Sequence, residues 1–234
     1  MDFTNRGGSA SVNQQGVIEE AQVAVEALCP GVDFDGQLEG TWRLLYTSAP
    51  DVTGLVARPP DLPFNLPLPF TVGDVFQRFS SPGEGVVENI IKLGFPFALE
   101  PENGATFTVR AEYRLATPKR IELLFREAEL GSLHLSPLAQ GLLAPALLPR
   151  GTAQMKLLQG LRGARLTVPL RTPSSLVGGL ARRRDTDDAS GRPVRTAGGE
   201  YLITYLDGDM LIGRSVGSRG SFIFERAAGH GECE

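Results

Sequence analysis

The side chains that could perform acid–base or nucleophilic chemistry are few in this sequence. Only two histidines occur: His134 lies in a leucine-rich segment, and His230 lies between glycines near the C-terminus. The phosphate-binding P-loop, the G-x-G-x-x-G dinucleotide turn and the H-E-x-x-H zinc motif are absent from the sequence. A histidine in a leucine-rich segment is more often packed or solvent-facing than catalytic. We therefore expect no enzymatic activity and nominate no catalytic residue.

Asp207 and Asp209 could serve as acid–base carboxylates or as part of a metal site. A metal ion needs three or four converging ligands, and the neighbouring sequence offers no further cluster. We interpret Asp207 as a turn residue that also pairs with Arg214 across a hairpin. Cys29 and Cys233 lie at opposite ends of the chain and form no C-x-x-C pair. Neither a metal nor a cofactor is therefore expected.

Length and charge narrow the class of protein. The chain has 234 residues and a formal net charge of −4, which suits one domain large enough to bury a core without metal or disulfide support. The acidic balance argues against a nucleic-acid partner. The longest apolar run, residues 138–148, is broken by Gln140, Gly141 and Pro145 and is shorter than the ~20 residues of a membrane-spanning helix. We expect a soluble or peripheral protein.

Hydrophobic spacing predicts one helix followed by strands. Ile18, Ala21, Val25 and Leu28 recur at helical intervals and predict an amphipathic helix over residues 15–29, which Pro30 ends. From Trp42 onward the apolar period changes to two. The clearest strand places residues 107, 109, 111, 113 and 115 on one face and threonine or charged residues on the other. It is followed by a turn at 117–119 and a second alternating strand, which indicates an antiparallel hairpin.

Further strands are predicted at 75–79, 86–91, 164–170, 201–206, 210–214 and 221–226. Asp207-Gly208 between two of them predicts a tight turn in which Gly208 supplies a positive φ. Eight or nine short antiparallel strands predict a mainly β protein, either a barrel or a sandwich. A barrel of about eight strands is either filled by side chains or holds one small ligand.

The remaining segments complete the domain organisation. We expect a flexible tail over 1–14, a single domain over 15–228 and a C-terminal tail over 229–234. Within the domain, residues 50–72 form a proline-rich apolar loop and residues 171–199 a mobile polar loop. A leucine-rich segment at 133–148 is expected to pack over one end of the barrel. The apolar side chains of the proline-rich loop are candidate contacts to a membrane or a protein partner: Leu55, Val56, Leu62, Phe64, Leu66, Leu68 and Phe70.

Aromatic residues recur on single strand faces, so several should project into one interior. Alternation fixes the face but not whether the enclosed space is full, so a packed core and a ligand-lined cavity are both consistent with it. The candidate ligand-binding residues are Trp42, Tyr46, Phe107, Val109, Tyr113, Phe125, Tyr201, Tyr205, Phe222 and Arg226. Among these, Tyr46, Tyr205 and Arg226 are the polar groups that could orient a ligand head group.

Two stretches resemble a known family. Residues 40–48, GTWRLLYTS, resemble the opening G-x-W-x-L-x-Y-T-S strand of the plastid lipid-associated proteins, or plastid fibrillins. Residues 204–214, TYLDGDMLIGR, followed by GSFIFER at 220–226, resemble the family's Y-L-D-x-D-L-R-I-x-R and G-x-x-F-x-x-x-R ending. The matching structural positions are Gly40, Asp207, Gly208, Asp209 and Arg214. Leu211 departs from the pattern, because the family usually has arginine there.

The resemblance implies an antiparallel lipocalin-like β-barrel with an N-terminal helix. It also implies a non-catalytic plastid protein, peripheral to thylakoids or plastoglobules, that binds or shelters a prenyl lipid, carotenoid, quinone or fatty acid. The alternative is a scaffolding protein without a ligand. Such a protein would dock on a membrane, a photosynthetic complex or a prenyl-lipid biosynthetic enzyme of the chloroplast.

Overall fold

The computed structural model describes residues 4–28, 37–50, 53, 71–81, 84–95, 97–101, 103–139, 159–160, 162–170, 182–187, 193–217 and 220–227. One helix, α1 (Val12–Ala27), precedes the strands. The strands are β1 (Gly40–Thr47), β2 (Thr71–Ser80), β3 (Glu84–Gly94), β4 (Ala105–Thr117), β5 (Arg120–Gly131), β6 (Arg165–Pro169), β7 (Arg182–Asp187), β8 (Pro193–Leu206), β9 (Met210–Ser215) and β10 (Ser221–Arg226).

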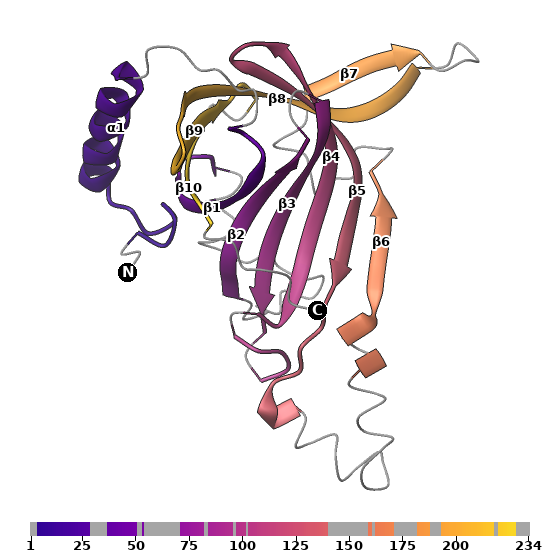
Figure 1. Cartoon of the computed structure of the whole chain (residues 1–234). Helices are drawn as coiled ribbons and strands as arrows, with labels where there is room; N and C mark the ends of the chain where they lie inside the picture. Colours follow the sequence, from indigo (N-terminus) through magenta and orange to yellow (C-terminus); the bar gives the residue numbers. More distant parts are fainter. Residues whose placement is uncertain are drawn as a thin grey trace, which may run out of the picture.

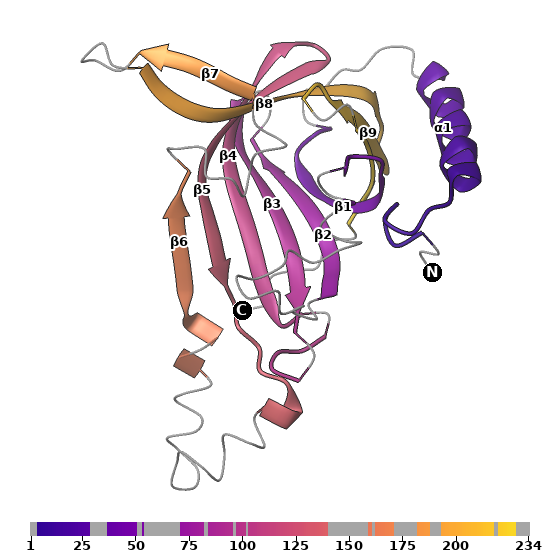
Figure 2. The same cartoon turned by 180° about the vertical axis from the view of Figure 1, so that it is seen from behind.

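The strands form one antiparallel sheet that closes on itself. Its order is β6-β5-β4-β3-β2-β1-β10-β9-β8-β7, and an additional pairing of β5 with β8 joins the two sides. Eight strands therefore form a closed ring, while β6 and β7 extend outside it (Figures 1 and 2). The predicted mainly β, antiparallel barrel with an N-terminal helix is confirmed.

The ring is closed over only part of the length of its strands. β5 pairs with β8 through residues 120–124, but with β6 through residues 127–131. In the same way, β1 pairs with residues 76–79 of β2, and β2 begins five residues earlier. Figures 1 and 2 show β2–β5 running on past the level of β8, β9 and β10. The part of β2–β6 that lies beyond β8, β9 and β10, which we call the far part, is therefore a curved sheet beside a closed barrel.

The helix starts earlier than its apolar spacing predicted. Ser11 caps α1 by accepting a hydrogen bond from the backbone N–H of Gln14, and the Gln14 side chain accepts from the Ser11 N–H. This reciprocal capping box fixes the first turn, and apolar periodicity alone does not reveal it. Residues 4–10, expected in a flexible tail, lie against the barrel, because the Arg6 carbonyl accepts from the Thr47 N–H and the Arg6 side chain donates to the Val72 carbonyl.

β7 and the start of β8 form an antiparallel hairpin in the range that was expected to be a mobile loop. The sequence there lacks apolar alternation, so the pairing was not predicted. Most of the proline-rich loop, all seven candidate contact residues between 55 and 70, and most of the 133–148 segment lie outside the described residues.

Two β-bulges change which face a side chain occupies. The register of β1 with β10 shifts between Leu44 and Tyr46, and that of β8 with β9 shifts between Ile203 and Tyr205. An extra residue in one strand reverses the alternation beyond it. Tyr46 therefore lies opposite Ile223 and Tyr205 opposite Ile212, on the outer face. Although Tyr46 is buried, it does not belong to the core cluster.

The hairpin turn at Asp207 also differs from the prediction. Gly208 is not among the residues with positive φ. Instead, the Asp207 carboxylate accepts hydrogen bonds from the backbone N–H groups of Asp209 and Met210, at 2.8 and 2.7 Å. This side chain replaces a backbone acceptor and holds the turn. The predicted pairing of Asp207 with Arg214 is wrong, because Arg214 binds Glu26 of α1 at 3.0 Å.

Close packing inside the ring depends on a glycine. A Cβ atom added to Gly213 of β9 would lie 2.2–2.4 Å from Cζ, Cε1 and the hydroxyl oxygen of Tyr201, which is buried in the core. Any side chain at position 213 would therefore collide with the aromatic ring of Tyr201 unless that ring moved.

We therefore expect Gly213→Ala to lower the free energy of unfolding by about 1–3 kcal/mol, because the Tyr201 ring cannot retreat from a packed core. Gly208→Ala is the control, since a Cβ atom added at Gly208 would meet nothing within 4 Å. Urea unfolding of the two variants should separate them. Equal stabilities would contradict this account of the packing.

Candidate functional site

One side of the barrel interior is closed around Trp42. This residue is 0% exposed, and its Nε1 donates to the Leu38 carbonyl at 2.9 Å. The guanidinium carbon of Arg226 lies 4.2 Å from the centre of the Trp42 ring. Arg226 also donates to the carbonyls of Gln37, Glu39 and Gly208. Each of its three guanidinium nitrogens thus donates within the protein, and the group covers the tryptophan.

Gly40 makes this arrangement possible. Its φ is 128°, and Nη1 of Arg226 lies 2.7 Å from the position of a Cβ at residue 40. The two strands that carry the motifs of residues 40–48 and 220–226 are therefore direct neighbours, with Trp42 opposite Arg226.

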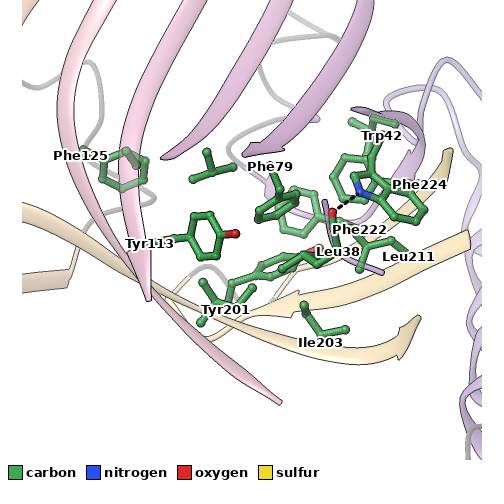
Figure 3. Close-up of a cluster of buried hydrophobic side chains, with 14 of the residues drawn as sticks. Leu38, Trp42, Phe79, Tyr113, Phe125, Tyr201, Ile203, Leu211, Phe222 and Phe224 are labelled. Atoms are coloured by element: carbon green, nitrogen blue, oxygen red, sulfur yellow. Dashed lines mark hydrogen bonds between the residues drawn. The ribbon is translucent and has the colours of Figure 1, made fainter. Parts of the chain in front are cut away.

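Aromatic rings fill the closed part of the interior (Figure 3). Phe79 and Tyr113 meet edge to face with centroids 5.4 Å apart, and Phe222 lies 5.9 Å from Tyr201 and 6.3 Å from Phe224. Such contacts belong to a packed core. In this part of the barrel, side chains occupy the space that strand alternation left undetermined.

The inner face of the far part of β2–β6 is less covered. Strand register places Val75, Ile91, Phe107, Leu130 and Leu166 in one row across it. Val75 and Phe107 are only partly buried, Leu130 is 36% exposed and Leu166 is 64% exposed. We call this row, together with Val109 and Val168 in the next row, the half-buried inner face.

A polar pair lies in that next row. Gln77 of β2 is opposite Asn89 of β3, and its Nε2 donates to Asn89 Oδ1 at 3.0 Å. Gln77 is only 7% exposed, and its Oε1 is buried without a hydrogen-bond partner. Buried amide oxygens normally accept a hydrogen bond, so this one marks an unmet acceptor on an apolar face.

The sequence-predicted ligand residues divide into three groups. Trp42, Tyr113, Phe125, Tyr201 and Phe222 belong to the filled core, where Arg226 covers Trp42, and Phe107 and Val109 belong to the half-buried inner face. Tyr46 and Tyr205 lie on the outer face, and Tyr205 donates to Asp207 at 2.6 Å. Gln77 and Asn89 were missed. Their alternation with Phe79 and Val87 was the available signal, because a polar residue on an apolar face indicates a hydrogen bond inside the protein.

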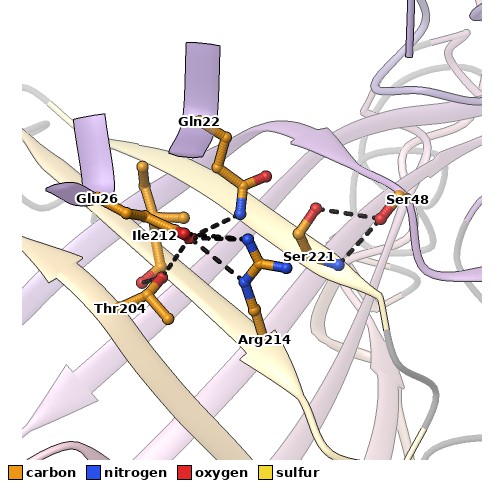
Figure 4. Close-up of polar contacts among 7 residues, drawn as sticks. All are labelled: Gln22, Glu26, Ser48, Thr204, Ile212, Arg214 and Ser221. Atoms are coloured by element: carbon orange, nitrogen blue, oxygen red, sulfur yellow. Dashed lines mark hydrogen bonds and ion pairs between the residues drawn. The ribbon is translucent and has the colours of Figure 1, made fainter. Parts of the chain in front are cut away.

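A second polar cluster attaches α1 to the outer wall (Figure 4). Gln22 and Thr204 donate to Glu26 at 2.8 and 2.7 Å, and Arg214 forms an ion pair with it at 3.0 Å. Burial acts to raise the pKa of Glu26, but the hydrogen bonds from Gln22, Arg214 and Thr204 outweigh it and lower that pKa. The negative charge of Glu26 therefore helps to hold α1 against β8 and β9.

The described residues offer little catalytic or metal-binding chemistry. They contain no group of three or more His, Cys, Asp or Glu side chains that could hold a metal ion. Residues 213–217 do have the spacing Gly-x-Ser-x-Gly. A nucleophile elbow requires a strand followed by a helix, whereas this stretch runs from β9 toward β10 in an antiparallel hairpin. Within the described part of the chain, no helix combines the length and apolar character needed to cross a bilayer.

The attachment of α1 through Glu26 should make the stability of the protein depend on pH. Because the pKa of Glu26 is lowered by folding, its contribution to stability is present above the unfolded pKa near 4.5 and is lost as the pH falls through the folded pKa. Glu26→Gln should therefore destabilise the protein at neutral pH, with the difference from wild type shrinking toward about pH 3. Glu20→Gln, on the exposed side of α1, is the control. A constant difference across this pH range would contradict the assignment.

Removal of the Tyr201 hydroxyl should stabilise the protein. It is buried without a hydrogen-bond partner, and burial raises the pKa of this phenol, which keeps it protonated. We expect Tyr201→Phe to raise the free energy of unfolding by about 1 kcal/mol, because an unmet polar group is removed. Tyr205→Phe, which loses the bond to Asp207, should do the opposite. Thermal and urea unfolding measure both, and a less stable Tyr201→Phe would refute the prediction.

Comparison with known proteins finds one family whose model matches nearly the whole chain. The family model PAP_fibrillin matches residues 1–225. The chain is 38% identical over 229 residues to the probable plastid-lipid-associated protein 10, chloroplastic, of Arabidopsis thaliana, covering 96% of this chain and 72% of that protein. It is 35% identical over 132 residues to the plastid-lipid-associated protein 6, chloroplastic, of the same plant, covering 53% and 44%. No solved structure matches the chain significantly.

Proposed function

The chain belongs to the PAP_fibrillin family, and on that premise we propose that it is a non-catalytic plastid protein that binds or shelters a small hydrophobic molecule. The ligand would be a prenyl lipid, carotenoid, quinone or fatty acid, taken up at a thylakoid or plastoglobule surface. The names of both relatives, plastid-lipid-associated and chloroplastic, support the compartment and the lipid partner.

The half-buried inner face carries this proposal. It is an apolar, concave-side surface that continues directly from the packed core and is incompletely covered. Val168 is 50% exposed there, and Leu166 is more exposed still. A flexible hydrocarbon chain laid along this row would extend the core rather than displace it.

The driving force would be burial of apolar surface. At about 25 cal/mol per Å², a ligand that buries about 300 Å² gains about 7.5 kcal/mol before the cost of immobilisation is subtracted. The closed part of the barrel cannot supply this area, because aromatic rings already occupy it. The ligand site is therefore proposed beside the filled core, not at its centre.

The scaffolding alternative depends on the apolar side chains of residues 55–70. Those residues lie outside the described part of the chain, so their role in membrane or partner contact stays a prediction.

The test compares adjacent residues on opposite faces of β4. Phe107 lies on the half-buried inner face, and Thr108 lies on the outer face opposite Glu129. We expect Phe107→Ala to weaken binding of the apolar fluorescent probe diphenylhexatriene by about tenfold, because a large apolar contact is lost. Thr108→Ala should leave the dissociation constant unchanged. Circular dichroism and unfolding curves confirm that both variants are folded. Equal dissociation constants for the two folded variants would remove the proposed site.

A further inference from the structure

The amide pair Gln77 and Asn89 lies at a boundary inside the protein. Its row is continued by Trp42 on β1 and Val109 on β4. The row on one side, which includes Phe79, belongs to the filled core, and the row on the other side is part of the half-buried inner face. A ligand lying on that face would bring one end to the amide pair.

Hydrogen-bond accounting shows what the pair lacks. Each amide side chain has one carbonyl acceptor and one NH₂ donor group. The bond from Gln77 Nε2 to Asn89 Oδ1 uses one donor and one acceptor. One carbonyl, that of Gln77, is left buried without a partner. Asn89 is half-buried, and its bond to Gln77 uses its carbonyl and leaves its NH₂ group outside that bond. Reversing both amides leaves the same inventory, one acceptor and one donor, so the deficit does not depend on how they are oriented.

We propose that the Gln77–Asn89 pair selects hydrophobic ligands that carry a hydroxyl group. A hydroxyl donates to the free carbonyl and accepts from the free NH₂ group, and so meets both needs with one oxygen. The inference rests on the proposed function, because the hydrocarbon part of the ligand occupies the half-buried inner face. The ligand class is a long-chain or prenyl alcohol, or a phenol with such a chain.

Other apolar ligands satisfy the pair less completely. A pure hydrocarbon leaves both groups unmet, and an ether or a quinone carbonyl accepts from the NH₂ group but gives nothing to the Gln77 carbonyl. A buried acceptor without a donor costs binding free energy. A ligand without a hydroxyl leaves the Gln77 carbonyl in that state, so the protein discriminates against it. The charged groups nearest in sequence, Arg78 and Glu88, point to the outer face, where they form an ion pair at 3.7 Å. The cation in this row among the described residues is Arg226, opposite Trp42, and its guanidinium already donates to the carbonyls of Gln37, Glu39 and Gly208.

The experiment measures displacement of diphenylhexatriene by dodecanol, dodecane and dodecyl methyl ether. The ratio of the dodecane to the dodecanol dissociation constant is measured for each protein and compared between proteins. The two competitors differ in solubility, but this difference is the same for every protein and cancels in the comparison. We expect this ratio to fall about tenfold from wild type to the variant Gln77→Leu/Asn89→Leu, which removes both hydrogen-bonding groups. The ether should bind wild type more weakly than dodecanol does, and the two should converge in the variant.

Controls separate this proposal from the proposed function. Thr108→Val, on the outer face, should leave all ratios unchanged. If the double variant does not fold, Asn89→Leu alone still removes one partner of the hydroxyl and should lower the ratio. If wild type and variant both bind diphenylhexatriene and show the same ratio of dodecane to dodecanol dissociation constants, selection for a hydroxyl is overturned, while the proposed function stands. A wild type that does not bind diphenylhexatriene or any of the three competitors would overturn the proposed function itself.

Discussion

Strand β5 has to satisfy two neighbours along one edge, and the rest of the structure depends on how it does so. Its first part pairs with β8 and closes the ring, whereas its last part pairs with β6. A bulge places Arg126 between these parts, and the Arg126 carbonyl accepts from the Leu170 N–H at 2.9 Å. Because a bulge bends a strand and increases its local twist, the edge can leave one partner and meet another without exposing unpaired backbone groups.

This change of partner divides the interior. Where β5 meets β8, all eight strands of the ring surround one volume, and rings such as Tyr201 and Phe222 fill it. Where β5 meets β6, the sheet faces no opposite strands of the ring, and its apolar residues stay partly exposed. The same sheet thus provides a stable core and a surface suited to a hydrophobic ligand. In the proposed function, stability and binding are therefore separated along the strands and need not compete for the same side chains.

Charged groups on the outer wall attach α1 to the barrel. The Glu26 carboxylate accepts hydrogen bonds from residues of α1, β8 and β9, and so connects three elements distant in sequence. Ion pairs such as Arg110 with Glu88 cross the outer face of β3 and β4, where solvent weakens them. On the inner face, Gln77 and Asn89 form a side-chain hydrogen bond among apolar residues, which is why the unmet acceptor there is informative while the many outer charges are not.

Alternation in the sequence determined the strands, the antiparallel class and the face of most residues, because a period of two leaves few other structures for residues such as Phe107 and Val109. The paired motifs around Trp42 and Arg226 determined the family. Tertiary structure alone decided the rest. One extra residue at each of two bulges moved Tyr46 and Tyr205 to the outer face, and such insertions leave no mark on local composition. The closing contact of β5 with β8 joins residues about eighty positions apart, and only that long-range pairing determines which part of the interior is full.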